Sequence, residues 1–340
     1  MTGARAAAAP PRALFVAPEF FGYDKDIQEE LGRAGYAVDR LLDRPLKGAE
    51  FAVAARLAPG LISSAASRYY VSQLDRLLGS YDLVLVVNGQ TLAPAVLKQF
   101  RRAFPRATFI LYLWDSLDNR PGLKRVLDLY DYVFSFDATD ARSLGLYHRP
   151  SFYTTRFDRN DIDPDIDISF IGTAHADRAR IVQAIDSRLA VGISRYWYLY
   201  LQAKWVYWIY KARGSLSGYG LEDFRYRALT RAQSAEIFHR SRAILDIHHP
   251  RQRGLTMRVF EALAAGKKIV TTNTQIRSYE IYDERGVFIV DRMNPQPIPT
   301  DFFCAPGPVL TGDLLRRYSL QGWLGEILRV AHLRPARHSE

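Results

Sequence analysis

The most constraining feature of the sequence is a short apolar run without alternation, Leu83–Val87 (LVLVV). Such a run is typical of a strand that is covered on both faces, as in a parallel sheet. Similar runs occur at Ala13–Ala17, Thr108–Leu113 and Tyr132–Phe136, and a helical pattern at Leu92–Phe104 separates two of them. Strands and helices that alternate at this spacing predict βαβ units and a doubly wound sheet.

A second series of the same kind begins after the acidic stretch Arg156–Asp167. Three further strands are predicted, at Ile168–Ile171, Ala243–Ile247 and Lys268–Thr272. A chain of 340 residues is expected to form two domains of about 150 residues each. We therefore predict an α/β protein with two Rossmann-like, doubly wound parallel-sheet domains. They are expected at residues 13–155 and 166–310, and residues 311–340 are expected to form a C-terminal helical tail.

The composition is that of an ordinary soluble globular protein, with 48% apolar and 24% charged residues. The single cysteine, Cys304, excludes an internal disulfide and a multi-cysteine metal site. Residues 1–12 lack the apolar core of a secretory signal, and no stretch of about 20 residues is free of charge. We therefore expect a cytoplasmic protein without a transmembrane helix.

The formal net charge is +10, which fits either an anionic partner or a sequence that simply favours arginine. The anionic partners to consider are nucleic acid, anionic lipid and phosphorylated small molecules. The sequence has no zinc-finger cysteines, no RNP-like aromatic motif and no block of Lys and Arg. Nucleic acid is therefore not expected as a partner.

Two loops of the second half are candidates for ligand binding, because ligands of doubly wound folds lie beyond the carboxyl ends of the strands. In the first loop, Gly172 and Thr173 would let the backbone approach a phosphate, with His175 beside them, although a plain tight turn also explains the glycine. In the second, His248 and His249 could bind phosphate, relay a proton or ligate a metal. Adjacent strand residues point to opposite faces, so one of the two histidines is expected to pack or lie on the surface.

The third candidate segment runs from Gly254 to Val270. Its apolar residues fall on one helical face, and Arg258 and Glu261 lie three apart on a polar edge. Gly254 and Thr256 open the helix, where the dipole favours a diphosphate. A plain amphipathic helix with an Arg–Glu pair is the alternative interpretation.

The same segment, GLTMRVFEALAAGKKIVTTN from Gly254 to Asn273, resembles the donor-binding segment of GT-B glycosyltransferases. The closer resemblance is to bacterial glycosyltransferases of capsule and lipopolysaccharide gene clusters, allied to the spore-maturation-like group. Three further segments are similar to that group, at Tyr112–Ser116, Phe134–Asp137 and Asp246–Pro250. The resemblance implies two domains that face each other across a cleft and a nucleotide-sugar donor.

By this resemblance, Glu261 would bind the ribose, while Arg258 and the backbone from Gly254 through Leu255 to Thr256 would face the diphosphate. The other donor-side candidates are Gly172, Thr173, His175, His248, His249 and Arg253. Arg253 stands eight positions before Glu261, where retaining enzymes of the commonest sort carry a second glutamate. The choice between an inverting and a retaining mechanism therefore stays open, and a catalytically inactive scaffold of a polysaccharide assembly complex is the alternative function.

In the first half, Asp115 follows a strong strand and is the first candidate for the base that deprotonates the acceptor. A helix cap is its alternative role. Glu19 is a further candidate, and Asn88 and Gln90 are suited to acceptor hydroxyls. The Asp-x-Asp patterns in Asp161–Asp165 precede a strand and are interpreted as a solvated connection. We expect no metal, and no cofactor besides the nucleotide sugar.

The aromatic stretch Tyr196–Lys211 (YWYLYLQAKWVYWIYK) is predicted to be one helix, with Trp197, Trp205 and Trp208 on one stripe. Such a stripe beside lysines suits a helix that lies in a membrane interface, although a core helix is an equal alternative. The resemblance implies a glycosyltransferase of cell-envelope biosynthesis, and a membrane contact would suit it. It would act on a polysaccharide or lipid-linked glycan, in the cytoplasm or at the inner face of the membrane.

Overall fold

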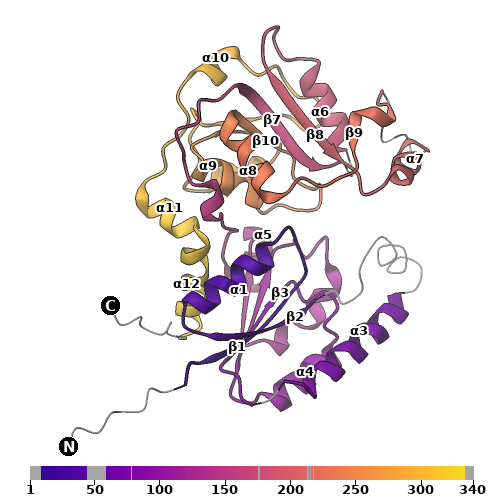
Figure 1. The fold of residues 1–340 in the computed structure, drawn as a ribbon, viewed down its shortest axis with the longest axis vertical. Helices are drawn as coiled ribbons and strands as arrows, with labels where there is room; N and C mark the ends of the chain where they lie inside the picture. Colours follow the sequence, from indigo (N-terminus) through magenta and orange to yellow (C-terminus); the bar gives the residue numbers. More distant parts are fainter. Residues whose placement is uncertain are drawn as a thin grey trace, which may run out of the picture. The chain divides into compact units, whose positions relative to one another are not determined.

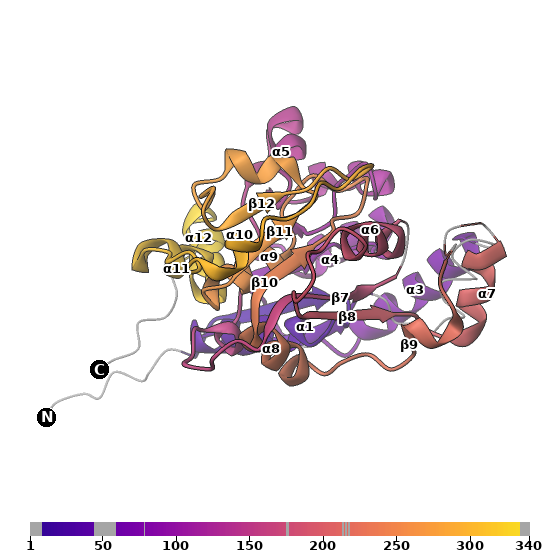
Figure 2. The same cartoon turned by 90° about the horizontal axis from the view of Figure 1, so that it is seen from above.

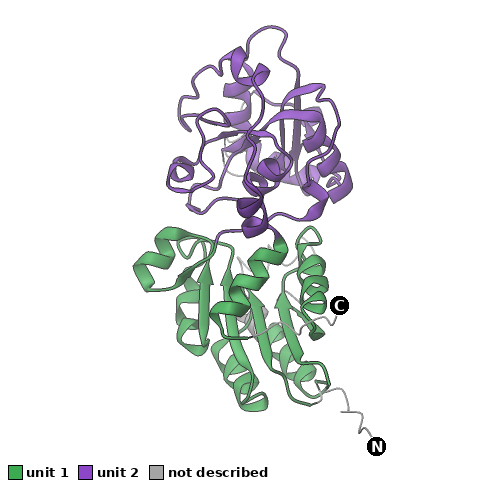
Figure 3. Cartoon of the chain, turned by 90° about the vertical axis from the view of Figure 1, so that its left-hand side faces the viewer, with its two compact units in different colours: residues 1–149, 320–340 green, residues 150–319 purple. Residues whose placement is uncertain are grey.

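The computed structural model describes residues 9–43, 59–77, 79–174, 177–212, 214, 216 and 218–333 (Figure 1). The chain divides into two compact units, which Figure 3 colours separately. The first contains residues 1–149 and 320–340, and the second contains residues 150–319. No helix in the described ranges is long and apolar enough to cross a membrane.

The first unit is built on a six-stranded parallel sheet in the order β2-β1-β3-β4-β5-β6. Its strands are β1 (Arg12–Ala17), β2 (Ala37–Leu42), β3 (Leu83–Val87), β4 (Thr108–Leu113), β5 (Tyr132–Ser135) and β6 (Tyr147–His148). All five side chains of β3 are fully buried, which explains the absence of alternation in the sequence. The strand order reverses between β1 and β3, so this is the topological switch point of the sheet.

Helices cover both faces of this sheet. They are α1 (Tyr23–Arg33), α3 (Pro59–Leu74), α4 (Pro94–Ala103), α5 (Ala138–Leu144) and α12 (Leu320–Val330), with the 3-10 turns η1 (Pro121–Arg125) and η2 (Leu127–Leu129). Tyr70 of α3 and Phe100 of α4 pack in one core with Val84 of β3. On α12, Trp323 is fully buried, and its ring lies 4.7 Å from that of Tyr112 of β4.

The second unit contains another six-stranded parallel sheet, in the order β12-β11-β10-β7-β8-β9. Its strands are β7 (Ile166–Thr173), β8 (Arg195–Tyr200), β9 (Phe224–Arg225), β10 (Ser241–Asp246), β11 (Lys268–Thr271) and β12 (Val287–Ile289). Counted within the unit, this order is the Rossmann order 3-2-1-4-5-6, and its switch point lies between β7 and β10. The expected fold class, an α/β protein with two Rossmann-like parallel sheets, is thereby confirmed.

The helices of the second unit also lie on both faces of their sheet. They are α6 (Arg178–Asp186), α7 (Lys204–Ala212), α8 (Arg231–Arg240), α9 (Met257–Ala264), α10 (Thr300–Cys304) and α11 (Gly312–Tyr318), with the 3-10 turns η3 (Thr155–Phe157), η4 (Leu221–Asp223) and η5 (Thr274–Ser278). Ile181 of α6 and Phe238 of α8 belong to different cores of the unit. Figure 2 accordingly shows α6 and α8 on opposite sides of β7 and β8.

The prediction of one helix at Tyr196–Lys211 is wrong, because the stretch forms β8, a short turn and then α7. On β8, Trp197 pairs with Phe170 of β7 and donates its ring N–H to Asp186 at 2.8 Å. Aromatic residues fit a half-buried strand as well as a helix, and a helical wheel cannot separate the two. The helical part begins only at Lys204.

Residues 311–340, expected as a helical tail, supply α11 to the second unit and α12 to the first. The backbone N–H of Tyr153 donates to the carbonyl of Tyr318 at 2.9 Å and holds the end of α11 within the second unit. Figure 1 shows α12 beside α1, with which it is in contact. The first unit is therefore made of two separate parts of the chain.

Replacing Trp323 by Ala tests how much the first unit depends on α12. Removing a fully buried tryptophan leaves a cavity, so we expect a loss of about 3–5 kcal/mol in the free energy of unfolding. Urea denaturation followed by circular dichroism measures this loss. Arg329→Ala, on the exposed side of the same helix, is the control and should change stability by less than about 0.5 kcal/mol. Equal effects of the two variants would show that α12 does not support the unit.

Candidate functional site

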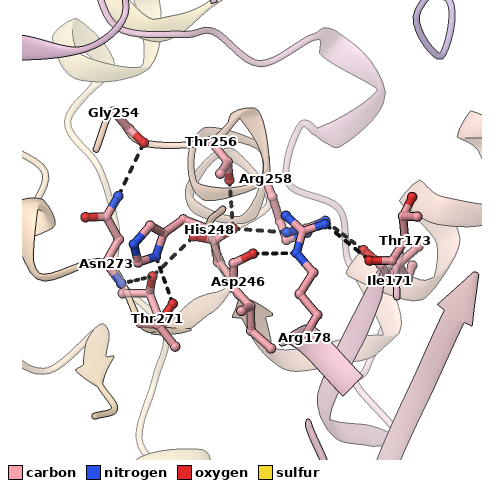
Figure 4. Close-up of polar contacts among 12 residues, drawn as sticks. Ile171, Thr173, Arg178, Asp246, His248, Gly254, Thr256, Arg258, Thr271 and Asn273 are labelled. Carbon is pink, nitrogen blue, oxygen red and sulfur yellow. Dashed lines mark hydrogen bonds and ion pairs between the residues drawn. The ribbon is translucent and has the colours of Figure 1, made fainter. Parts of the chain in front are cut away.

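The switch point of the second unit brings a cluster of charged side chains together. Ligands of open parallel sheets bind outside the carboxyl ends of the strands where the order reverses, here β7 and β10. The helix α6 follows β7, and α9 lies between β10 and β11. Figure 4 shows side chains from all these elements directed toward one another.

Asp246, the last residue of β10, lies at the centre of this cluster with 1% of its surface exposed. Its carboxylate accepts hydrogen bonds from Thr256 (2.8 Å), Arg258 (3.0 Å) and Thr271 (3.2 Å). Thr256 is the N-cap residue of α9, yet its hydroxyl donates to Asp246 and makes no capping bond to the helix. The first N–H groups of α9 therefore have no side-chain cap at the end where the helix dipole favours an anion.

Two arginines lie close to Asp246. Arg258 donates to the carbonyl of Ile171 at 2.7 Å, and Arg178 donates to the carbonyl of Ile247 at 2.8 Å. The guanidinium of Arg258 also lies 5.5 Å from the ring centre of Phe170. These contacts hold both guanidinium groups at the carboxyl ends of β7 and β10.

Arg292, in the segment after β12, completes the cluster. It forms an ion pair with Asp177 at 2.6 Å and donates to the carbonyl of His248 at 3.1 Å. Together, Arg178, Arg258 and Arg292 face two carboxylates, those of Asp177 and Asp246. The cluster therefore has an excess of positive charge, which suits a diphosphate.

The electrostatics of the cluster perturb two of its members. Burial, and then the positive charges of Arg258 and Arg292, lower the pKa of Arg178 against the opposing effect of Asp246. Burial also lowers the pKa of His248 to about 4, with Arg292 and Arg178 acting in the same direction and Asp246 against it. His248 is therefore neutral at pH 7, and its Nδ1 lies 2.8 Å from the Thr272 hydroxyl.

Asn273 fixes the loop that enters α9. Its side-chain amide donates to the carbonyls of Arg253 at 3.0 Å and Gly254 at 3.3 Å, as Figure 4 shows for Gly254. The side chain of Arg253 is exposed, and Leu255 is buried. The loop backbone is therefore held in place just before the uncapped start of α9.

The remaining donor-side candidate residues lie in different surroundings. Gly172 and Thr173 are the last residues of β7, and a Cβ at Gly172 would lie 2.8 Å from Phe170 and 3.4 Å from Arg258. His249 accepts a hydrogen bond from the backbone N–H of Arg251, so it belongs to a local turn. Glu261 is buried on α9. His175 lies outside the described residues.

The candidates of the first half lie at the switch point of the first unit. Asn88 follows β3 with φ of 63°, accepts from the backbone N–H of Trp114 at 3.1 Å and donates to Asp115 at 3.4 Å. Arg120 donates to the same Asp115 carboxylate at 3.1 Å. The structure thus brings Asn88 and Asp115 together. The side chains of Gln90 and Glu19 are exposed, after β3 and β1 respectively.

Arginines bind two aspartates at the start of β7. Asp165 forms an ion pair with Arg240, and Asp167 forms one with Arg242 at 3.2 Å. Within the ranges that the structure describes, no group of three or more His, Cys, Asp and Glu residues is arranged to hold a metal ion.

Five residues of the cluster are absent from the sequence-based candidates: Asp177, Arg178, Asp246, Asn273 and Arg292. Asp246 is the last residue but one of the predicted strand Ala243–Ile247, so the rule that ligands lie near strand ends could have found it. Arg292 carries no such signal, because it reaches the cluster only through the packing of β12 beside β11.

One part of the chain matches a known family. Residues 176–290, within the second unit, match the family described as glycosyl transferase-like. A search of curated proteins finds no match to the chain.

Three solved structures illustrate the structural similarity. A glycosyltransferase from Rickettsia africae ESF-5 superimposes with a TM-score of 0.55 at 10% identity, over 94% of this chain and 97% of that one. Anabaena Alr3699/HepE in complex with UDP-glucose has a TM-score of 0.54 at 10% identity, over 95% of each chain. The S. aureus MnaA–UDP structure has a TM-score of 0.52 at 12% identity, over 97% of this chain and 99% of that one.

At these identities the similarity defines the fold alone, which is the two-domain GT-B fold. The family match covers the segment that contains most of the charged cluster. The chain therefore has the GT-B fold, and its residues 176–290 are glycosyl transferase-like.

The depressed pKa of His248 makes stability depend on pH. Folded His248 stays neutral down to about pH 4, whereas the unfolded chain binds a proton near pH 6.5. Stability is therefore lost as the pH falls from 6.5 to 4, by roughly 3 kcal/mol from this group. Urea denaturation between pH 7 and pH 4.5 measures it, and His248→Gln should lose less stability than the wild type.

The matched control for this experiment is His332→Asn, which changes an exposed histidine. Its loss of stability over the same pH range should equal that of the wild type. An unchanged acid loss in His248→Gln would contradict the assigned environment of His248.

Proposed function

We propose that the chain transfers a sugar from a nucleoside diphosphate sugar, with the donor diphosphate bound at the switch point of the second unit. The single observation that carries this proposal is the cluster of Arg178, Arg258 and Arg292 beside the uncapped start of α9. A leaving diphosphate develops negative charge, and fixed guanidinium and N–H groups stabilise it. The complexes of two similar structures with UDP-glucose and UDP support a uridine nucleotide.

In this proposal Glu261 binds the ribose, as the resemblance implies. Arg258 and the backbone from Gly254 to Thr256 bind the diphosphate, with Gly172, Thr173, His175, His248, His249 and Arg253 around the donor. Arg178 and Arg292 are additions that rest on the geometry. The side chain of Arg253 is exposed, and no carboxylate stands at that position.

The acceptor binds the first unit in this proposal. Asp115 accepts the proton of the acceptor hydroxyl, Asn88 and Gln90 contact other hydroxyls, and Glu19 is the second candidate for the base. Arg120 and Asn88 hold the Asp115 carboxylate in one orientation, as a base requires. The acceptor we propose is a polysaccharide or lipid-linked glycan of the cell envelope, of the kind made by capsule and lipopolysaccharide gene clusters.

Thermal unfolding with a panel of UDP-, GDP-, CMP- and dTDP-linked sugars tests the donor site. One class of nucleotide sugar should raise the free energy of unfolding, by about 2.7 kcal/mol at 100 times its Kd. Arg258→Ala and Glu261→Ala should each weaken binding about 10- to 100-fold, because hydrogen bonds to charged groups contribute about 1.5–3 kcal/mol. Arg277→Ala, an exposed arginine of η5, is the control and should bind as the wild type does.

The outcomes of this panel distinguish an active glycosyltransferase from a catalytically inactive scaffold. If no nucleotide sugar stabilises the protein, the assignment of the donor site is wrong. Stabilisation without transfer to any acceptor and without hydrolysis would favour the inactive scaffold, whose best support is Arg253 in place of a second glutamate. Loss of transfer in Asp115→Asn, with donor binding unchanged, would support Asp115 as the base.

We further propose that α7, the helical part of 196–211, contacts the membrane surface that holds a lipid-linked acceptor. Trp205, Trp208 and Ile209 are 48%, 60% and 41% exposed on one side of α7, while Val206 and Tyr207 are buried on the other. Lys204 and Lys211 are exposed beside this apolar face. Tryptophans flanked by lysines suit an interface with anionic lipid.

Sedimentation with lipid vesicles tests the membrane contact. The protein should bind vesicles that contain phosphatidylglycerol, and the double variant Trp205→Ser/Trp208→Ser should bind at least 10-fold more weakly, because less apolar area is buried. Met293→Ser, a 75% exposed apolar residue of the same unit, is the control and should bind normally. Equal binding by the double variant would exclude α7 as the contact.

A further inference from the structure

We infer that the switch point of the first unit holds a pyranose ring of the acceptor, stacked on the side chains of Phe20, Phe21 and Trp114. We call these three residues the aromatic shelf. The inference rests on the proposed function, in that the bound ring belongs to the sugar acceptor. It adds the chemical class of the ligand and the residues that recognise it.

The aromatic shelf follows two strands of the first sheet. Phe20 and Phe21 come after β1 and are 44% and 52% exposed, and Trp114 comes directly after β4. The ring centroid of Phe20 lies 4.8 Å from that of Phe21 and 5.4 Å from that of Trp114. Large aromatic side chains are usually buried, so exposed rings in mutual contact indicate a surface that is covered by a ligand.

The loop that presents the shelf is firmly held. The backbone N–H of Phe20 donates at 3.2 Å to Asp24, which is 2% exposed and paired with Arg40. Phe21 adopts a φ of 48°, which is rare for a bulky residue. A buried carboxylate thus supports an unfavourable backbone conformation whose result is an exposed phenyl ring, as is common at binding sites.

Polar groups lie directly beside the shelf. Asn88 accepts from the backbone N–H of Trp114 at 3.1 Å, and its amide donates to Asp115 at 3.4 Å. Arg120 donates to Asp115 at 3.1 Å. The group therefore offers a carboxylate that accepts, a guanidinium that donates and an amide that does both.

This combination matches a sugar ring better than an apolar molecule. One face of a pyranose carries C–H groups that pack on an aromatic ring, and its edge carries hydroxyls that both donate and accept. An apolar ring would cover the shelf but would leave Asp115 and Asn88 desolvated without new partners. The topology gives the same location, since β1 and β3 flank the switch point and β4 is the next strand.

Saturation-transfer NMR on the full chain without donor tests this inference. The probes are the methyl α- and β-pyranosides of glucose, galactose, mannose and N-acetylglucosamine at millimolar concentration, with cyclohexanol as an apolar ring of the same size. At least one pyranoside should receive saturation, and more than cyclohexanol does. Its signal should fall at least five-fold in Phe21→Gly, which removes the ring while glycine accepts the positive φ.

Two further variants complete the test. Asp115→Asn should also lower the signal, whereas Tyr147→Ala, which removes a 47% exposed ring from β6 of the same unit, should leave it unchanged. No signal from any pyranoside on the wild type, or a full signal in Phe21→Gly, would overturn the inference. A cyclohexanol signal as strong as the best pyranoside would also overturn it. If pyranosides bind but no nucleotide sugar does, the proposed donor is contradicted and the inferred pyranose site is supported.

Discussion

The carboxylate of Asp246 is the interaction on which the charged cluster of the second unit depends. It is buried at the end of β10 and holds Thr256, Arg258 and Thr271 by hydrogen bonds. By taking the hydroxyl of Thr256, it leaves the start of α9 without a side-chain cap. By pairing with Arg258, it holds that guanidinium at the carboxyl end of β10, close to the other arginines of the cluster. One side chain thus prepares both the helix end and the arginines for an anion.

Both units follow the same topological rule and use it for different chemistry. In each parallel sheet the strand order reverses once near the centre, and polar side chains gather beyond the strand ends at that point. The second unit places arginines there, around Asp246 and Asp177. The first places exposed aromatic rings there, next to Asp115. The difference lies in the loops, because loops carry the specificity of a fold that is otherwise repeated.

The fold could be predicted from the sequence where local pattern and tertiary environment agree. Leu83–Val87 and Thr108–Leu113 form strands with the predicted bounds, since buried parallel strands leave an unmistakable apolar run. Tyr196–Lys211 could not be predicted in the same way, because its aromatic residues suit both β8 and α7. The α9 segment was recognisable from its own residues. The arginines around it were not, since Arg178 reaches Asp246, and Arg292 reaches His248, only after the sheet has brought distant loops together.

Because the chain returns to its first unit, the two units are not completed in the order in which they begin. Residues 150–319 are continuous, so the second unit has all of its residues once position 319 has left the ribosome. The first unit is begun earlier, yet its sheet lacks α12 and the buried Trp323 until the last part of the chain emerges. During synthesis the side of the first sheet around Tyr112 is therefore exposed while the second unit folds. Of the two units, the one that begins first along the chain is the one that is completed last.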